Sequence, residues 1–199
     1  MHTFETTPAE NSAAPSQRAT PSQPSGPFYP EKGTRQPNAD LVLSPTDAEL
    51  AKGQIIWVEG VVRDQFDRPV EQALVEIWQA CHSGRYHHSE DTNTAEFDPH
   101  FQYWGRSLTN EKGQYRFRTV RPGVYPAETG WDRPPHIHFK ISHVSHTPLI
   151  TQMYFAGDPL NDVDQILQKL DRQMQNELMT ELVQAEDELW PVATFNIRL

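Results

Sequence analysis

The sequence predicts a mainly β fold, an antiparallel β-sandwich with long loops. Short segments that are rich in β-branched residues, or that alternate apolar and polar residues, recur along the chain. Clusters of Gly, Pro, Asn and Asp separate these segments at short intervals, which is typical of turns between strands. The 199 residues include 17 prolines, so a loop-rich β protein is favoured over a helical bundle.

The first part of the chain differs in composition from the rest. Residues 1–25 are rich in Thr, Pro, Ser, Ala, Gln and Glu, and we expect them to be disordered or to form an extended arm. Residues 26–199 are then expected to form a single domain. The aromatic pair Phe28-Tyr29 stands between prolines. It either packs on the domain surface or lines a pocket, of this chain or of a neighbour.

Two helical segments are expected beside the strands. Ser44, followed by Pro45, predicts one short N-terminal helix that extends to Leu50. Apolar residues recur near helical spacing in a second segment, near 162–176. A long polar loop is expected after the segment Ser83–His88, and it extends to about Gln102. The expected strands span residues 55–63, 73–79, 115–120, 136–139, 149–155 and 194–199.

Charge and composition exclude several classes of partner. The net charge is −10 and there is no run of Lys or Arg, so neither nucleic acid nor an anionic membrane surface is an expected partner. No apolar run approaches the roughly 18 residues of a membrane-spanning helix. The N-terminus lacks the basic and apolar regions of a secretory signal, and Cys81 is the only cysteine. These features predict a cytoplasmic protein without an intrachain disulfide.

Two histidines form the most informative motif. His136 and His138 flank Ile137, and on a strand residues i and i+2 share one face, about 6.6 Å apart. Ile137 and Phe139 then point the other way, into a core. The spacing suits two ligands of one metal ion, although an alternating pair of histidines on a half-exposed strand also occurs without a metal.

Groups of other chemistry lie close to this motif or in turns that can reach it. Arg133 stands three residues before His136, and we expect it to pair with Asp132. Tyr86 and Tyr125 follow glycine-containing turns next to strand ends, from which a side chain can reach a site on a rigid scaffold. Taken alone, each tyrosine is better explained as a packed aromatic ring with a solvated hydroxyl.

Different metals suit different members of this group. The lack of a cysteine cluster disfavours structural zinc. Two histidines with a carboxylate would favour ferrous iron or a hydrolytic zinc ion. Two phenolates with two imidazoles form a hard, anionic set that prefers ferric iron, because a strongly charged cation lowers the pKa of the phenol that it holds.

Four separate blocks carry a resemblance to a known family. Over residues 20–199 the chain resembles the intradiol ring-cleavage dioxygenases, and among these it is most similar to the protocatechuate 3,4-dioxygenases. The segment from Thr20 to Phe28 resembles the start of an α-type subunit of that enzyme, whereas the ligand set resembles the β-type subunit. The matching blocks are Val58–Tyr86, Gly113–Pro126, Arg133–Phe139 and Leu149–Pro159.

The resemblance implies both an activity and a cofactor. The activity is insertion of both atoms of O2 into a protocatechuate-like catechol, which opens the ring to a cis,cis-muconate. The tyrosinate at Tyr125 is expected to leave when the substrate arrives and to take one of its protons. Arg133 is expected to stabilise negative charge on the substrate, and Gln152 either orients ligands and substrate or is a sheet-face glutamine. Non-haem ferric iron, Fe(III), is expected on Tyr86, Tyr125, His136 and His138.

Differences from the family leave the substrate open. Ala127 stands where the protocatechuate enzymes carry Trp, and the loop from Tyr125 to Arg133 is shorter than theirs. Hydroxyquinol or a substituted catechol is therefore an alternative substrate. A carboxylated substrate needs a further cation or polar clamp, and the candidates are Arg85, Arg106 and Arg35.

A different class of function stays open as well, because the same fold can serve as a metal-free β-sandwich binding module. The family builds its sites from two related subunits, and this chain carries features of both. We therefore expect a homo-oligomer in which the Phe28-Tyr29 arm closes a neighbour's pocket.

Overall fold

The protein is mainly β, as the sequence predicts. The structure is a computed structural model that describes residues 17–31, 38–42 and 49–199. Most of the expected N-terminal helix falls in residues 43–48, outside the described residues. The helical elements are η1 (Pro159–Asp162), η2 (Leu167–Lys169) and α1 (Arg172–Leu178). The strands are β1 (Ile55–Arg63), β2 (Leu74–Trp78), β3 (Trp104–Leu108), β4 (Gln114–Val120), β5 (Tyr125–Glu128), β6 (Trp131–Arg133), β7 (His136–His143), β8 (His146–Phe155), β9 (Met179–Thr180), β10 (Leu182–Val183), β11 (Val192–Thr194) and β12 (Ile197–Arg198).

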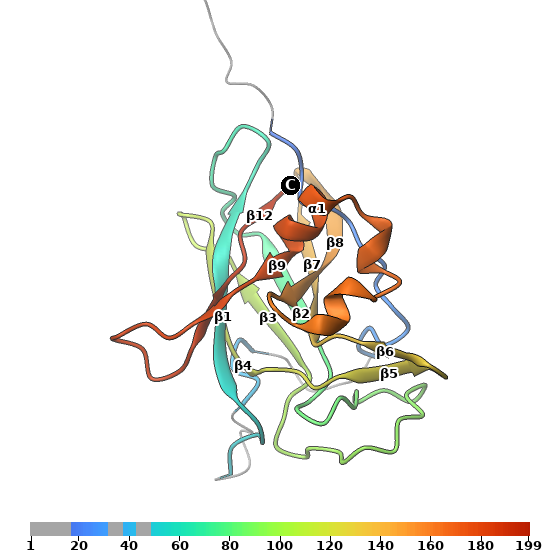
Figure 1. The fold of residues 1–199 in the computed structure, drawn as a ribbon. Helices are drawn as coiled ribbons and strands as arrows, with labels where there is room; N and C mark the ends of the chain where they lie inside the picture. Colours follow the sequence, from blue (N-terminus) through green and yellow to red (C-terminus); the bar gives the residue numbers. More distant parts are fainter. Residues whose placement is uncertain (1–16, 32–37, 43–48) are drawn as a thin grey trace, which may run out of the picture.

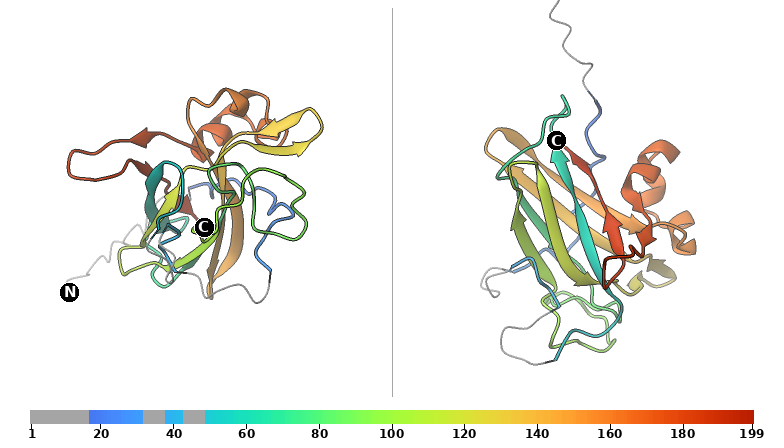
Figure 2. Two further views of the ribbon diagram at one scale, coloured as in Figure 1. Left: turned by 90° about the horizontal axis from the view of Figure 1, so that it is seen from below. Right: turned by 90° about the vertical axis from the view of Figure 1, so that its left-hand side faces the viewer.

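Two sheets lie face to face (Figures 1 and 2). In one sheet β1 pairs antiparallel with β4 and in parallel with β11 and β12, and β10 pairs with β11. The other sheet has the order β3-β2-β7-β8-β9, antiparallel except between β8 and β9. The three parallel pairings differ from the expected antiparallel pattern. They arise because the chain passes through η1, η2 and α1 before it returns to both sheets.

The core lies between the sheets and is built by the alternation of β7. Ile137, Phe139 and Ile141 are fully buried on its inner face. The Phe139 ring lies 5.0 Å from the Phe195 ring and 6.1 Å from the Tyr115 ring of β4, measured between ring centroids. The prediction that Ile137 and Phe139 face a core is confirmed, and the opposite face of β7 is left for the histidines.

Truncation of Phe139 tests this account of the core. Phe139→Ala is expected to lower the free energy of unfolding by about 3–5 kcal/mol, because it removes a ring packed between both sheets and leaves a cavity. Val144→Ala is the matched control, since Val144 is 99% exposed in the turn between β7 and β8. Chemical denaturation of both variants checks the prediction. Similar unfolding free energies for the two variants would contradict it.

The helical segment expected near residues 162–176 is divided into short pieces. Three aspartates begin new turns by accepting backbone hydrogen bonds: Asp158 from Leu160, Asp164 from Ile166, and Asp171 from Met174. Such local side-chain bonds compete with a continuous helix. The hairpin β5–β6, which turns at Gly130 with φ +80°, occupies a stretch that the sequence predicted as a loop.

Candidate metal site

The two histidines share one buried face of β7. His136 and His138 are each 3% exposed, and their ring centroids lie 4.9 Å apart. Trp78, which pairs with His138 across β2 and β7, stacks on the His138 ring at 4.9 Å with an interplanar angle of 7°. The predicted spacing therefore brings both imidazoles together, and a neighbouring strand fixes the plane of one.

Hydrogen bonding leaves His136 with a nitrogen lone pair inside the site. Its Nδ1 lies 2.7 Å from the Pro134 carbonyl oxygen, which only accepts, so Nδ1 carries the hydrogen. Its Nε2 is therefore the bare nitrogen, 3.2 Å from Tyr86 Oη and 3.1 Å from Arg133 Nη1. His138 Nδ1 is buried without a hydrogen-bond partner among the described residues. Burial and the Arg133 charge hold the pKa of both imidazoles well below its usual value, so both are neutral.

The two tyrosines come from separate segments, Tyr86 from a loop and Tyr125 from the start of β5. Tyr86 is 4% exposed and Tyr125 is half-buried, with ring centroids 5.4 Å apart. Gly84 permits this approach, because an added Cβ would lie 1.9 Å from the Val124 carbonyl oxygen. The glycine-containing turns thus bring the two phenol rings together, with Tyr86 Oη 3.2 Å from His136 Nε2.

Neither phenol ionises readily in this environment. Burial raises the pKa of Tyr86 above its usual value, although the Arg133 charge opposes this. Burial, followed by the Asp91 charge, raises the pKa of Tyr125 to about 12. A phenolate here needs a cation of high charge beside it. Two neutral imidazoles and two such phenols fit a ferric ion, since the two phenolates offset much of its charge.

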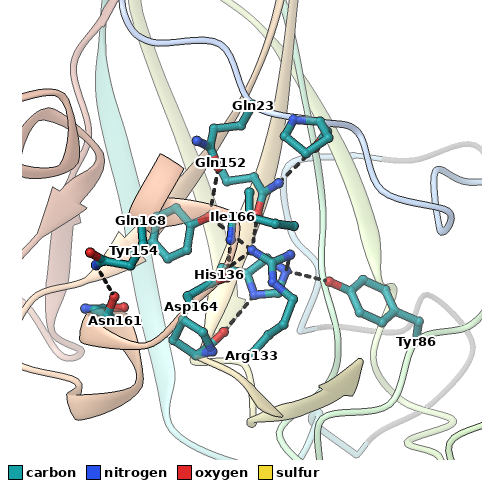
Figure 3. A network of polar contacts seen from close by, with 12 residues as sticks. Gln23, Tyr86, Arg133, His136, Gln152, Tyr154, Asn161, Asp164, Ile166 and Gln168 are labelled. Atoms are coloured by element: carbon teal, nitrogen blue, oxygen red, sulfur yellow. Dashed lines mark hydrogen bonds and ion pairs between the residues drawn. The ribbon is translucent and has the colours of Figure 1, made fainter. Parts of the chain in front are cut away.

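Arg133 lies beside His136 and Tyr86 in a polar network (Figure 3). It is 5% exposed, and its Nη2 lies 2.9 Å from Gln152 Oε1, 3.0 Å from Tyr154 Oη and 2.9 Å from Asp164 Oδ2. Asp164 is fully buried, so its carboxylate is the counter-charge of the guanidinium. The network fixes the guanidinium against the His136 ring.

The expected pairing of Arg133 with Asp132 is wrong. Consecutive side chains on β6 point to opposite faces, and Asp132 is exposed whereas Arg133 is buried. Asp164, 31 residues further along the chain, takes the place of Asp132. Nothing local in the sequence marks Asp164. The one available signal is physical, since a buried arginine requires a buried anion.

The N-terminal arm lies over its own chain's site. We call residues 20–31 the strap. Gln152 Nε2 donates to the Pro24 carbonyl oxygen at 2.8 Å, and Tyr154 Oη donates to Gln23 Oε1 at 3.0 Å. The Phe28 ring lies 4.7 Å from the Tyr86 ring and 5.3 Å from the Tyr125 ring. Of the two interpretations of the aromatic pair, lining a pocket of this chain is therefore the one observed.

Carboxylates do not complete a metal site in the part of the chain that the structure describes. No three His, Cys, Asp or Glu side chains are grouped there in a way that could hold a metal ion. Asp164 accepts from Arg133 and from the Ile166 amide. A site of two histidines and one carboxylate therefore finds no support in the described residues.

Comparison with known proteins decides the family. Residues 25–199 match the profile of the dioxygenase family Dioxygenase_C. The chain belongs to the intradiol ring-cleavage dioxygenase family. It is 43% identical over 139 residues to the protocatechuate 3,4-dioxygenase beta chain of Burkholderia cepacia, across 63% of this chain and 59% of that protein. It is 30% identical over 195 residues to a chlorocatechol 1,2-dioxygenase of Rhodococcus opacus, across 87% of this chain and 70% of that protein.

Solved structures agree with this family. The dioxygenase domain of a dioxygenase and carbohydrate-binding protein fusion from Streptomyces sp. SirexAA-E superposes with a TM-score of 0.68 at 28% identity, covering 92% of this chain and 98% of that one. The matches to curated relatives are less complete. They span 59% of the Burkholderia protein and 48% of a catechol 1,2-dioxygenase from Candida albicans.

Two of the three candidate clamps for a substrate carboxylate are among the residues described for this member of the intradiol dioxygenase family. Arg85 Nη1 donates to the Ala95 carbonyl oxygen, and its guanidinium lies over the Phe97 ring. Arg106 is exposed on β3. Arg35 lies outside the described residues.

No helix in the described ranges is long and apolar enough to cross a membrane.

Proposed function

We propose that the chain is a non-haem ferric dioxygenase that opens the ring of a catechol between its two hydroxylated carbons. The observation that carries this proposal is the convergence of two imidazole nitrogens, two phenols and one buried guanidinium. Arg133 and Tyr125 are the proposed catalytic residues, and Gln152 is the residue proposed to orient Arg133. The proposed iron ligands are Tyr86, Tyr125, His136 and His138.

Bound ferric iron would supply Lewis acidity toward the two catechol oxygens and the oxygen chemistry of ring opening. Tyr125 is the side chain placed to take a substrate proton. It is less buried than Tyr86, and a raised phenol pKa of about 12 makes its phenolate a strong base. Oη of Tyr125 therefore holds a catechol proton once the phenolate is free.

Arg133 supplies a fixed positive charge. Its Nη1, 3.1 Å from His136 Nε2, is the end of the guanidinium that faces the candidate ligands. Asp164, Gln152 and Tyr154 hold the other end, so the charge needs no reorganisation as negative charge develops on the substrate ring. Gln152 is therefore a positioning residue for Arg133, which favours the orienting role over a passive sheet-face glutamine.

Protocatechuate is the first candidate substrate, and the uncharged, chlorinated and hydroxylated catechols are the alternatives. Incubation of the iron-loaded chain with each compound under ¹⁸O2 tests the reaction. A cis,cis-muconate carrying both labelled oxygen atoms is the expected product. A yellow semialdehyde would indicate cleavage beside the hydroxyls. No oxygen uptake with any catechol would favour a metal-free binding module.

A substitution at Gly26 tests whether a side chain in close contact with His138 disturbs the proposed iron site, apart from the backbone strain that it also causes. Gly26 has φ +67°, and an added Cβ would lie 3.3 Å from His138 Cε1. Gly130 has φ +80° with nothing within 4 Å of the added Cβ. Gly26→Ala and Gly130→Ala are each expected to lose about 1–2 kcal/mol of unfolding free energy, because both are left-handed. Only Gly26→Ala is expected to weaken iron retention during dialysis against a chelator, and equal retention would contradict the proposal.

We also propose a homo-oligomer in the cytoplasm. The motivation is the resemblance of this one chain to both subunit types of the protocatechuate enzymes, together with a single buried, free Cys81. Light scattering of the purified chain tests the assembly. A monomer with full activity would contradict it.

A further inference from the structure

Two neighbouring cross-strand pairs of β2 and β7 lie beside the candidate site. Trp78 of β2 pairs with His138 of β7, and two residues away Glu76 pairs with Lys140. Because residues i and i+2 share a face, all four side chains lie on the same side of the sheet. Tyr29 of the strap lies over both pairs. Its ring is edge-on to the Trp78 ring, with 5.0 Å between the ring centroids.

The hydroxyl of Tyr29 both donates and accepts a hydrogen bond. Tyr29 Oη donates to Glu76 Oε1 at 3.1 Å and accepts from Lys140 Nζ at 3.2 Å. Lys140 Nζ also lies 3.6 Å from Glu76 Oε2 and 4.8 Å from the centroid of the Tyr29 ring. Glu76 is only 7% exposed, so the phenol satisfies a buried carboxylate. Phenylalanine has the same ring and could make neither hydrogen bond.

A short series of ring contacts connects Tyr29 to the proposed ligands. Tyr29 packs on Trp78, and Trp78 stacks on His138. The adjacent residue Phe28 packs on Tyr86 and on Tyr125. The position of residues 28 and 29 therefore sets one wall of the site and supports the plane of one imidazole.

The two halves of the strap are held differently. The first half is bonded to β8 through Gln152 and Tyr154. The second half is bonded through Tyr29 and through the Glu31 contact with Ser89. The Glu31 contact is exposed, and exposed polar pairs contribute little. Tyr29 is therefore the principal polar attachment of the second half, beside the ring packing of Phe28.

We propose that Tyr29, held by Glu76 and Lys140, is a positioning residue that fixes the strap over the site and thereby sets substrate affinity. The kinetic part rests on the proposed dioxygenase function, whereas the fixation of the strap does not. Tyr29 touches neither the candidate ligands nor Arg133 by hydrogen bonding in the described contacts. Its effect passes through Trp78 and Phe28.

Proteolysis of the iron-free chain tests the fixation directly. Chymotrypsin cleaves after Phe28 only when the strap opens, since Phe28 is 8% exposed. Tyr29→Phe is expected to speed cleavage at this bond by about tenfold, because a hydrogen bond to a charged group is lost. The matched control is Glu188→Gln, which weakens an ion pair with Arg116 of β4 in the other sheet. Cleavage after Phe28 at the wild-type rate in Tyr29→Phe would overturn the proposal.

Kinetics of the iron-loaded chain test the consequence. Tyr29→Phe is expected to raise KM by about tenfold and to change kcat by less than about threefold, because binding and not the reacting group is altered. Lys140→Met is expected to act in the same direction and Lys140→Arg to restore most of the wild-type KM. An equal fall in kcat and kcat/KM with an unchanged KM would overturn the positioning role. If the wild-type chain cleaves no catechol, the proposed function fails, and faster proteolysis of Tyr29→Phe would still support the strap.

Discussion

Replacement of Arg133 by leucine is expected to lower kcat/KM for ring cleavage by about 10²–10³-fold, the loss typical of removing one preorganised charge-stabilising donor. Arg133 is buried, and its guanidinium is held by three partners at 2.9–3.0 Å. Steady-state kinetics of the iron-loaded variant, normalised to iron content, measure the effect.

The single variant also leaves a buried charge without its partner. Asp164 is fully buried, so water cannot compensate for the lost ion pair of its carboxylate. The free energy of unfolding is therefore expected to fall by about 3–5 kcal/mol. Arg133→Leu/Asp164→Asn removes both charges and retains an oxygen that can accept from the Ile166 amide. This double variant is expected to recover most of the stability and none of the activity. Recovery of activity in the double variant would contradict the role of Arg133.

Replacement of Tyr86 by phenylalanine is expected to weaken iron binding by at least about 100-fold, since loss of even a supporting group around a metal typically costs 10–100-fold. The phenylalanine ring keeps the packing against Phe28, so the fold is expected to stay intact. Competition with a chelator measures the affinity.

Tyr103→Phe is the matched control for Tyr86→Phe. Tyr103 is buried, and its hydroxyl accepts from the Asp98 amide in the loop that precedes β3. Its described ring contacts are with His87, Phe97 and Phe101 and not with the proposed iron ligands. Its loss is expected to affect stability and to leave iron affinity unchanged. Equal iron affinities of Tyr86→Phe and Tyr103→Phe would exclude Tyr86 as a ligand.

The sequence was most informative where a local period determines the structure. The alternation of β7 predicts which side chains face the core and which face the site, and the structure places Phe139 and His138 accordingly. Glycine at position 84 indicated the turn before Tyr86, whereas its close approach to Val124, where only a residue without Cβ fits, is seen only in the structure. Residue types and short spacings were sufficient for the alternation of β7 and for this turn.

Features that depend on distant parts of the chain were not predictable in this way. The partner of Arg133 is Asp164, and no local rule connects positions 31 residues apart. The segment near 162–176 has helical spacing, yet aspartate side chains repeatedly capture backbone amides and shorten its helices. The strap was predicted only as one of several alternatives, since its place over Tyr86 depends on contacts made after the sheets have formed.

The visible spectrum of the iron-loaded wild-type chain, recorded together with its iron content, tests the central claim most directly. Two phenolates on a ferric ion are expected to give one iron per chain and an intense red-brown absorption that changes when a catechol is added without oxygen. A chain that binds iron without colour would contradict the tyrosinate site. So would a coloured wild-type chain whose spectrum is left unchanged by both Tyr86→Phe and Tyr125→Phe.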